Sequence, residues 1–217
     1  MNYELLESAA ALRHLTILGG FHPTPSDDVP KGFQTLLLLG PDEAAGFWAH
    51  VTGGPEFADS APDPVDRWSR RVIGDWADEI GALALYPFGG PPYQPFQRWA
   101  VRTQRIHTSP IMLLVHDTAG LMVSFRGALA LRGRIDLPPA PSSPCISCKD
   151  KPCLTACPVN AFADGGYDVP ACKSYLGTVP GQDCMMNGCA ARRACPVSQH
   201  FGRVPTQSAY HMQMFRG

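Results

Sequence analysis

Cysteine is missing from the whole stretch before Cys145, and all eight cysteines of the 217-residue sequence lie between Cys145 and Cys195. Long apolar runs are missing too, since the four leucines at 36–39 are far too few to span a bilayer. Residues 1–16 mix charged with apolar side chains and have no continuous apolar core, unlike a secretory signal or a membrane anchor. We therefore expect a cytoplasmic protein with no membrane partner.

The sequence also lacks an excess of charge, with 18 Lys and Arg against 19 Asp and Glu and a formal net charge of −1. This balance gives no electrostatic reason to expect a nucleic-acid partner. The glycine pairs at 19–20, 53–54 and 89–90 do not form G-x-G-x-x-G, and there is no phosphate-loop or Ser/His/Asp signature. Nucleotide hydrolysis and nucleophilic catalysis therefore have no support.

The uneven cysteine distribution divides the chain in two. Residues 137–144 read Leu-Pro-Pro-Ala-Pro-Ser-Ser-Pro, and their four prolines exclude both a helix interior and a sheet ladder. We predict a domain over residues 1–137, an extended linker over 138–144 and a cysteine-rich domain over 145–217. A chain of this length can bury a core without metal, so size alone does not require the cysteines.

The first domain alternates helix and strand signals. Apolar residues at helical spacing predict a helix over Tyr3–Leu15 and a longer one from Asp63-Pro64 to Ile80. Four apolar runs predict strands, with a turn at residues 116–120 between the last two. The runs are Phe33–Leu39, which stops at Gly40-Pro41, then Ala82–Tyr86, Ile111–Val115 and Leu121–Phe125. Together they predict an α+β fold with an N-terminal α/β sandwich-like domain.

The first cysteine group has the spacing C-x2-C-x4-C-x3-C-P and consists of Cys145, Cys148, Cys153 and Cys157. A tight loop of this kind can aim three thiolates at one iron-sulfur cube while a distant fourth closes the site. In two-cluster bacterial ferredoxins, the cysteine before proline ligates the other cluster. A second cysteine group is therefore expected downstream.

That second group is present as an isolated Cys172 followed by Cys184, Cys189 and Cys195, the last again before proline. Crossed ligation then predicts two [4Fe-4S] clusters in a ferredoxin-like domain. We assign one cluster to Cys145, Cys148, Cys153 and Cys195, and the other to Cys157, Cys172, Cys184 and Cys189. The spacing of the second group departs from the ordinary run, which leaves a [3Fe-4S] or labile cluster open there.

Other uses of eight cysteines compete with this interpretation. Two zinc sites would also take eight thiolates, but zinc sites usually have separated C-x2-C pairs, whereas four cysteines here lie within thirteen residues. Disulfides are disfavoured because glutathione keeps cytoplasmic thiols reduced. The balance favours iron and sulfide.

The cysteine order resembles that of epoxyqueuosine reductase, whose isolated cysteine lies in a segment similar to Cys172-Lys-Ser-Tyr-Leu. The resemblance is specific over Cys145–Pro196 and weaker upstream. It implies a cobalamin-binding α+β domain ahead of the iron-sulfur module, and an oxidoreductase activity. Three departures stand out. Residues 86–93 hold no carboxylate where the family has its catalytic aspartate, Thr108-Ser109-Pro110 replaces the family's Gly-Lys-Asn, and these 217 residues contain no counterpart of its C-terminal repeats.

The resemblance suggests a cobalamin or flavin pocket lined by residues 86–97 and 106–110, with Tyr86, Tyr93 or His107 as the available proton donors. Arg98, Arg102 and Arg105 fit one solvated face of a helix better than a phosphate site. We therefore expect a single-electron carrier that serves a redox partner protein. The alternatives are a cobalamin- or flavin-dependent reductase of a small-molecule substrate, and a structural iron-sulfur or zinc module.

Overall fold

The computed structural model describes residues 2–217, apart from the side chain of Asp164, and shows a mixed α+β protein with small antiparallel sheets. Contacts group the chain into two compact units. The first comprises residues 1–106 and 124–141, and the second comprises 107–123 and 142–217. The predicted domains of 1–137 and 145–217 differ from these units in two respects: residues 107–123 group with the cysteine-rich part, and the predicted linker of 138–144 is divided between the units after Pro141.

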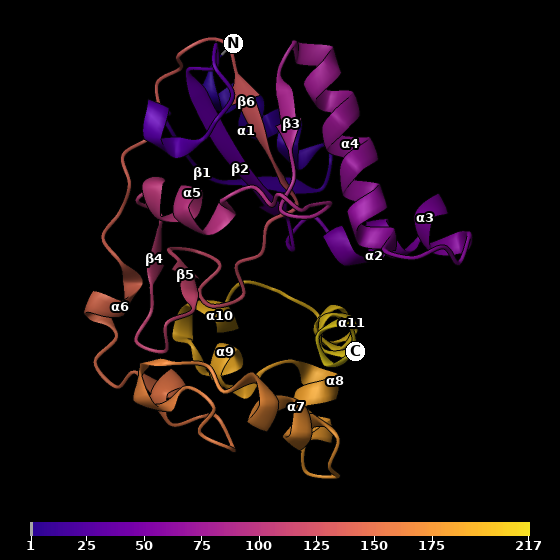
Figure 1. Cartoon of the computed structure of the whole chain (residues 1–217), viewed down its shortest axis with the longest axis vertical. Helices are drawn as coiled ribbons and strands as arrows, with labels where there is room; N and C mark the ends of the chain where they lie inside the picture. The colour runs from indigo at the N-terminus through magenta and orange to yellow at the C-terminus, as the bar shows by residue number, and fades with distance from the viewer. Residues whose placement is uncertain (1) are drawn as a thin grey trace. The chain divides into compact units, whose positions relative to one another are not determined.

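The first unit is built on a four-stranded antiparallel sheet in the order β1-β2-β6-β3 (Figure 1). The strands are β1 (Leu15–Phe21), β2 (Thr35–Pro41), β3 (Leu83–Leu85) and β6 (Gly127–Leu131). Every residue of the two central strands β2 and β6 is buried. Both faces of the sheet are thus covered, which explains the continuous apolar run of β2.

Helices pack on this sheet. Helix α1 (Tyr3–Ala11) and helix α5 (Phe96–Arg102) contact β1, and helix α4 (Pro64–Ile80) contacts β3 and β6. A Cβ added at Gly127 would lie 2.8 Å from Ile73 Cδ1, so glycine lets α4 approach β6 closely. The unit also contains the short elements η1 (Pro25–Asp27), α2 (Phe47–Thr52) and α3 (Pro55–Ala58).

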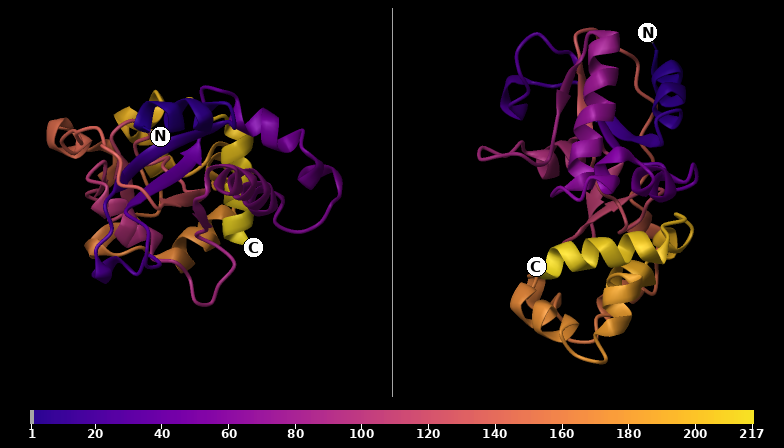
Figure 2. Two further views of the ribbon diagram at one scale, coloured as in Figure 1. Left: turned by 90° about the horizontal axis from the view of Figure 1, so that it is seen from above. Right: turned by 90° about the vertical axis from the view of Figure 1, so that its right-hand side faces the viewer.

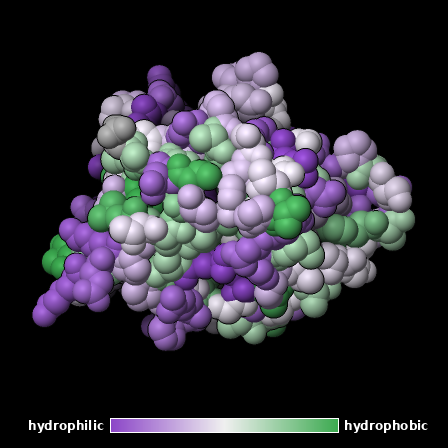
Figure 3. Space-filling view, turned by 90° about the horizontal axis from the view of Figure 1, so that it is seen from below, coloured by the Kyte–Doolittle hydropathy of each residue, from purple (hydrophilic) through white to green (hydrophobic). Residues whose placement is uncertain are grey.

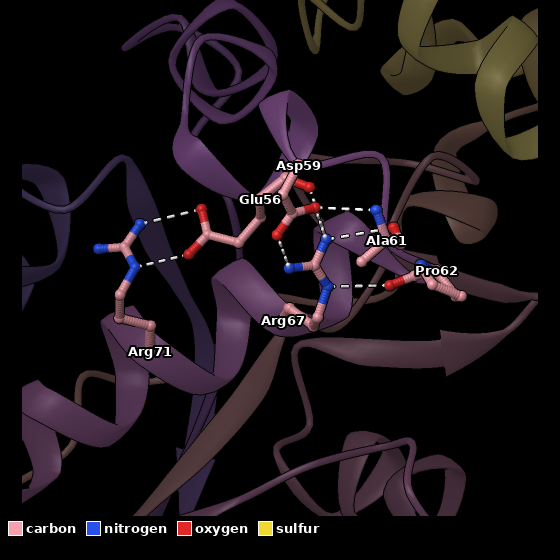
Figure 4. A network of polar contacts seen from close by, with 6 residues as sticks. All are labelled: Glu56, Asp59, Ala61, Pro62, Arg67 and Arg71. Atoms are coloured by element: carbon pink, nitrogen blue, oxygen red, sulfur yellow. Dashed lines mark hydrogen bonds and ion pairs between the residues drawn. The ribbon is translucent and has the colours of Figure 1, made fainter.

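An ion-pair network joins α3 to α4 (Figure 4). The buried carboxylate of Glu56 accepts hydrogen bonds from Arg71 Nε at 2.6 Å and Nη2 at 3.1 Å. One turn away, Arg67 binds both carboxylate oxygens of Asp59 at 2.7 Å and donates to the Glu56 carbonyl at 2.6 Å. The two arginines therefore tie the short helix α3 to the long one.

The second unit contains mostly short helices. A two-stranded sheet, β4 (Ile106–Thr108) and β5 (Leu114–His116), comes first, although Ile106 itself groups with the first unit. The C-terminal helix α11 lies along α8, and α7 also contacts α8 (Figure 2). The helical elements are α6 (Pro144–Ser147), η2 (Pro152–Leu154), η3 (Ala163–Gly165), α7 (Val169–Leu176), α8 (Gln182–Asn187), α9 (Ala190–Ala194), α10 (Pro196–Gln199) and α11 (Pro205–Arg216).

The predicted long helix is confirmed from Pro64 to Ile80, and the first helix is confirmed but ends at Ala11. The buried strand predicted at 33–39 forms as β2, yet it continues through Gly40 and Pro41 because these residues pair with β1. The strand predicted at 82–86 is shorter, at Leu83–Leu85.

Two strand predictions need correction. The strand predicted at 111–115 covers only 114–116, since 111–113 form a turn and bends. The strand predicted at 121–125 is wrong: these residues form a turn and irregular backbone, and the strand begins at Gly127. The turn at 116–120 is confirmed, with His116 and Gly120 exchanging backbone hydrogen bonds of 3.0 Å in both directions. Within the described residues, no helix combines the length and apolar character that a membrane span needs.

Candidate functional site

Four of the eight cysteines surround one cavity of about 500 Å³ in the second unit. They are Cys145, Cys148, Cys153 and Cys195, and no other cysteine of residues 2–217 lines it. Three come from the first cysteine group, whereas Cys195 is the last cysteine of the second group. Cys157, which follows Cys153 by four residues, lies outside the lining. The set around the cavity is thus the one that crossed ligation assigns to the first cluster.

Short helices aim these cysteines. Cys145 lies in the first turn of α6, where its backbone N–H donates to Ser143 Oγ at 3.4 Å, and Cys148 caps the same helix. Cys153 lies in η2, which packs against α9. Cys195 separates α9 from α10, and Pro196 starts the new helix. Proline is favoured at a helix start because its missing N–H has no partner there, so the Cys-Pro pair places the thiol at a sharp change of direction.

The wall of the cavity comes partly from residues 107–123. Ile111, Val115 and Leu121 form a buried apolar cluster with Cys153, Ala191 and Cys195. Two side chains from the helices on either side of Cys195 fix Leu121: its N–H donates to Ser198 Oγ at 2.8 Å, and its carbonyl accepts from Arg192 at 3.1 Å. The segment predicted as a strand pair of the first domain therefore packs on Cys153 and Cys195.

Burial makes thiolates costly at this cavity. It raises the pKa of Cys145, and the neighbouring thiols of Cys195 and Cys148 raise this pKa further. The pKa of Cys153 is raised by burial first and then by the neighbouring thiols of Cys145, Cys195 and Cys148. Four adjacent thiolates are stable only when positive charge replaces their protons, which bound metal supplies. Lys149 and Lys151, both exposed, lie among the lining residues.

Zinc and an iron-sulfur cluster would place four cysteine sulfurs differently. Within the described part of the chain, no group of three or more His, Cys, Asp or Glu side chains is placed to hold a metal ion. Zinc would draw four sulfurs to about 2.3 Å from one point. A [4Fe-4S] cube takes one thiolate on each iron, so its sulfurs stand around a volume. Four thiols around a cavity match this second arrangement.

Three of the other four cysteines lie in or at the ends of the consecutive helices α7, α8 and α9, and Cys157 lies in the loop between η2 and η3. Cys172 is in α7, Cys184 in α8, and Cys189 caps the start of α9. Burial raises the pKa of the Cys184 thiol, and the charge of Cys189 raises this pKa further. Cys157 Sγ accepts a hydrogen bond from Ala161 N at 3.3 Å. All eight cysteines carry free thiols.

Tyr167 contacts one member of this second set. Its hydroxyl donates to Cys172 Sγ at 3.3 Å. The pKa of Tyr167 is raised well above its usual range, first by burial, then by this hydrogen bond and by the charges of Cys172 and Cys189. The tyrosine therefore keeps its proton at neutral pH. It was not among the residues predicted from sequence, and its only signal there is its place five residues before Cys172.

The three predicted proton donors do not share a unit. Tyr86 and Tyr93 belong to the first unit and His107 to the second. Tyr86 donates to the Arg70 carbonyl at 3.1 Å, and Tyr93 is 67% exposed. His107 Nε2 is buried without a hydrogen-bond partner among the described residues. Of the segment predicted around it, Ser109 and Pro110 line the cysteine cavity.

The arginines at 98 and 102 have structural partners. Arg98 pairs with Asp28, and Arg102 binds the buried Asp27 at 3.1 Å. Burial opposes the charge of Asp27, but hydrogen bonds from Thr24 and the charge of Arg102 hold its pKa below the usual value. These pairs fit the solvated helix face that we favoured over a phosphate site.

Comparison with known proteins adds no family to this description, since no protein-family model, no curated protein and no solved structure matches the chain. The residues and their geometry therefore carry the functional argument alone.

Proposed function

We propose that this chain is a cytoplasmic iron-sulfur redox protein that binds two [4Fe-4S] clusters and passes single electrons to a partner protein. Cys145, Cys148, Cys153 and Cys195 would hold one cluster, and Cys157, Cys172, Cys184 and Cys189 the other. When bound, such clusters take up and release one electron at a time. The chain supplies the thiolates, the apolar wall that limits water, and hydrogen bonds that adjust the potential.

One observation carries the proposal. Cys195 joins the first three cysteines around the cavity, although it lies 38 residues beyond Cys157, which is left out. The two-cluster ferredoxin rule requires this exchange of the cysteine before proline. A pair of independent zinc knuckles would instead keep each sequence group together.

The test is analysis of protein purified without oxygen. We expect roughly eight iron and eight sulfide per chain, with visible absorption that bleaches on reduction and returns on oxidation. Stoichiometric zinc without sulfide would overturn the proposal. Iron and sulfide that show no reversible reduction would point to a structural module instead.

A second candidate function follows from the position of Ser109 and Pro110. These residues belong to the segment that we expected to line a cofactor pocket, although Thr108-Ser109-Pro110 replaces the family's Gly-Lys-Asn there, and they line the cysteine cavity. The candidate is a cobalamin- or flavin-dependent reductase, related to epoxyqueuosine reductase, that acts on a small molecule with the clusters as its electron relay. Residues 86–93 have no carboxylate, so epoxide reduction of the family type is not expected. Titration with hydroxocobalamin and with flavin mononucleotide tests this candidate, and absence of binding at micromolar concentration leaves the plain electron carrier.

A further inference from the structure

The hydroxyl of Tyr167 points its hydrogen at a cysteine sulfur. It donates to Cys172 Sγ at 3.3 Å, within the range for a sulfur acceptor. On the basis of the proposed function, we propose that Tyr167 is a positioning residue. It raises the reduction potential of the cluster held by Cys157, Cys172, Cys184 and Cys189.

Aromatic packing holds the ring of Tyr167 in place. Phe162 stacks on it with ring centres 4.7 Å apart and planes inclined by 20°. Phe215 of α11 lies nearly parallel to the same ring, at 6.1 Å and 12°. Lys173, one residue after Cys172, places its ammonium 5.4 Å from the centre of the Phe215 ring. The ring is therefore fixed by segments before and after the cysteine helix.

The backbone fixes the distance between the tyrosine and the cysteine. Asp168 N donates to the Ala161 carbonyl at 2.7 Å, and the Asp168 carboxylate caps α7 by accepting from Ala171 N at 2.9 Å. Cys172 N then donates to the Asp168 carbonyl at 3.1 Å in the first turn. Because Tyr167 directly precedes this cap, its position relative to Cys172 is set by the helix start.

A hydrogen bond to a thiolate becomes stronger as negative charge accumulates on the sulfur. One-electron reduction adds such charge to a cluster, so the Tyr167 hydroxyl favours the reduced form. Hydrogen bonds to the sulfurs are among the factors that set iron-sulfur potentials. Tyr167 does not hold a metal, and its removal changes the potential without removing a ligand.

The direct test compares Tyr167→Phe with Tyr175→Phe. Tyr175 lies in α7, the helix that carries Cys172, but its hydroxyl donates to the Pro180 carbonyl at 3.1 Å. Iron and sulfide are measured first, and both potentials are then determined by anaerobic titration followed by electron paramagnetic resonance. For Tyr167→Phe we expect wild-type iron content and a more negative potential for one cluster only. The shift should correspond to about a tenfold change in the ratio of oxidised to reduced cluster, which is about 59 mV for one electron.

A second substitution strengthens the hydroxyl as a donor. Replacement of Tyr167 by 3-fluorotyrosine makes the phenol more acidic and keeps the ring, so the same potential should move in the positive direction. The fluorotyrosine protein tests the role of Tyr167 even if Tyr167→Phe fails to fold.

Unchanged potentials in a cluster-loaded Tyr167→Phe or fluorotyrosine protein would overturn the role of Tyr167 and leave the proposed function standing. An equal shift in Tyr175→Phe would also overturn it, because the effect would then belong to the helix. Wild-type protein without iron and sulfide would instead reject the proposed function, and the inference with it.

Discussion

Ser198 and Gly120 attach the loop of residues 107–123 to helix α10, which Cys195 precedes. Ser198 Oγ is buried and accepts the N–H of Leu121 at 2.8 Å. Gly120 has φ +56°, and a Cβ added there would lie 2.5 Å from Ser198 N. The backbones approach too closely for any side chain at position 120. The wall of the cavity thus depends on these two residues.

Ser198→Ala should destabilise the second unit. The substitution leaves the buried N–H of Leu121 without its acceptor, which costs about 1–3 kcal/mol. Urea unfolding of the cluster-loaded protein, followed by the visible absorption of the clusters, measures this loss. Ser174→Ala, at an exposed position of α7, is the matched control and should unfold like the wild type. Equal midpoints for the two variants would contradict the prediction.

The Glu56 carboxylate should make the stability of the first unit depend on pH. Hydrogen bonding from Arg71, against the opposing effect of burial, lowers the pKa of Glu56 from its ordinary value of 4.5. A lowered folded-state pKa means that this stabilisation is fully present above about pH 4.5 and is lost as pH falls through the folded-state pKa. Glu56→Gln should therefore cost about 1–3 kcal/mol at pH 7, and the difference from wild type should shrink in acid.

Urea unfolding at pH 7 and at several values below pH 4.5 measures this difference, with tryptophan fluorescence as the signal. Glu79→Gln on the same helix is the control, because the Arg13–Glu79 pair leaves Glu79 58% exposed. Exposed pairs contribute about 0–1 kcal/mol. A cost for Glu56→Gln that stays constant into acid would mean that the carboxylate charge is not responsible.

Among the elements, the helices were better predicted than the strands. Helix α4 has proline in its first turn, and it ends at Ile80 because the next residue, Gly81, adopts a left-handed backbone conformation. Proline and glycine thus mark both ends of this helix in the sequence. Strand β6 reads Gly-Ala-Leu-Ala-Leu, which has low strand propensity, and it forms because it pairs with β2 and β3 on either side. Long-range pairing of this kind leaves no local signal.

The cysteine set around the cavity followed from sequence because the Cys-Pro rule is a rule about connectivity. The residues that form the wall of that cavity did not follow from the sequence. Ile111, Val115 and Leu121 have the apolar pattern of ordinary strands, and nothing near them shows that they pack on cysteines 30 or more residues later. The role of Tyr167 was hidden for the same reason, since it depends on the placement of a side chain.

Crossed ligation predicts opposite results for the two cysteines that precede proline, Cys157 and Cys195. Cys195→Ser, between α9 and α10, should damage the cluster of the first cavity, whereas Cys157→Ser should damage the other one. Each variant is expected to lose or convert one cluster and to keep the other, with iron falling by up to about half. Mössbauer and electron paramagnetic resonance spectra distinguish the two clusters. The same cluster lost in both variants, or a structure with Cys195 bound beside Cys184 and Cys189, would contradict the assignment.

At the scale of the whole molecule, the two units differ in what forms their cores. The first unit buries strands β2 and β6 and three of its tryptophans, Trp68, Trp76 and Trp99, without any cysteine. The buried cluster of the second unit contains Cys153 and Cys195, with Cys145 and Cys189 packed against it. On the face shown in Figure 3, the most strongly apolar residues, in dark green, appear as separate spots among paler and purple ones. Metal should therefore matter for the stability of one unit far more than for the other.

Removal of the clusters should unfold the second unit and leave the first one folded. Without the cluster, the apolar residues that line the cysteine cavity lose packing contacts. This loss destabilises the short helices around it, which have only marginal stability on their own. Hydrogen exchange followed by mass spectrometry should show fast exchange over 142–217 after anaerobic chelation, while β2 and β6 remain protected. All four tryptophans lie in the first unit, so the wavelength of their emission should stay that of buried indole. Loss of protection throughout the chain would show that the first unit also depends on the clusters, and unchanged protection of 142–217 would show that the cysteine helices fold without metal.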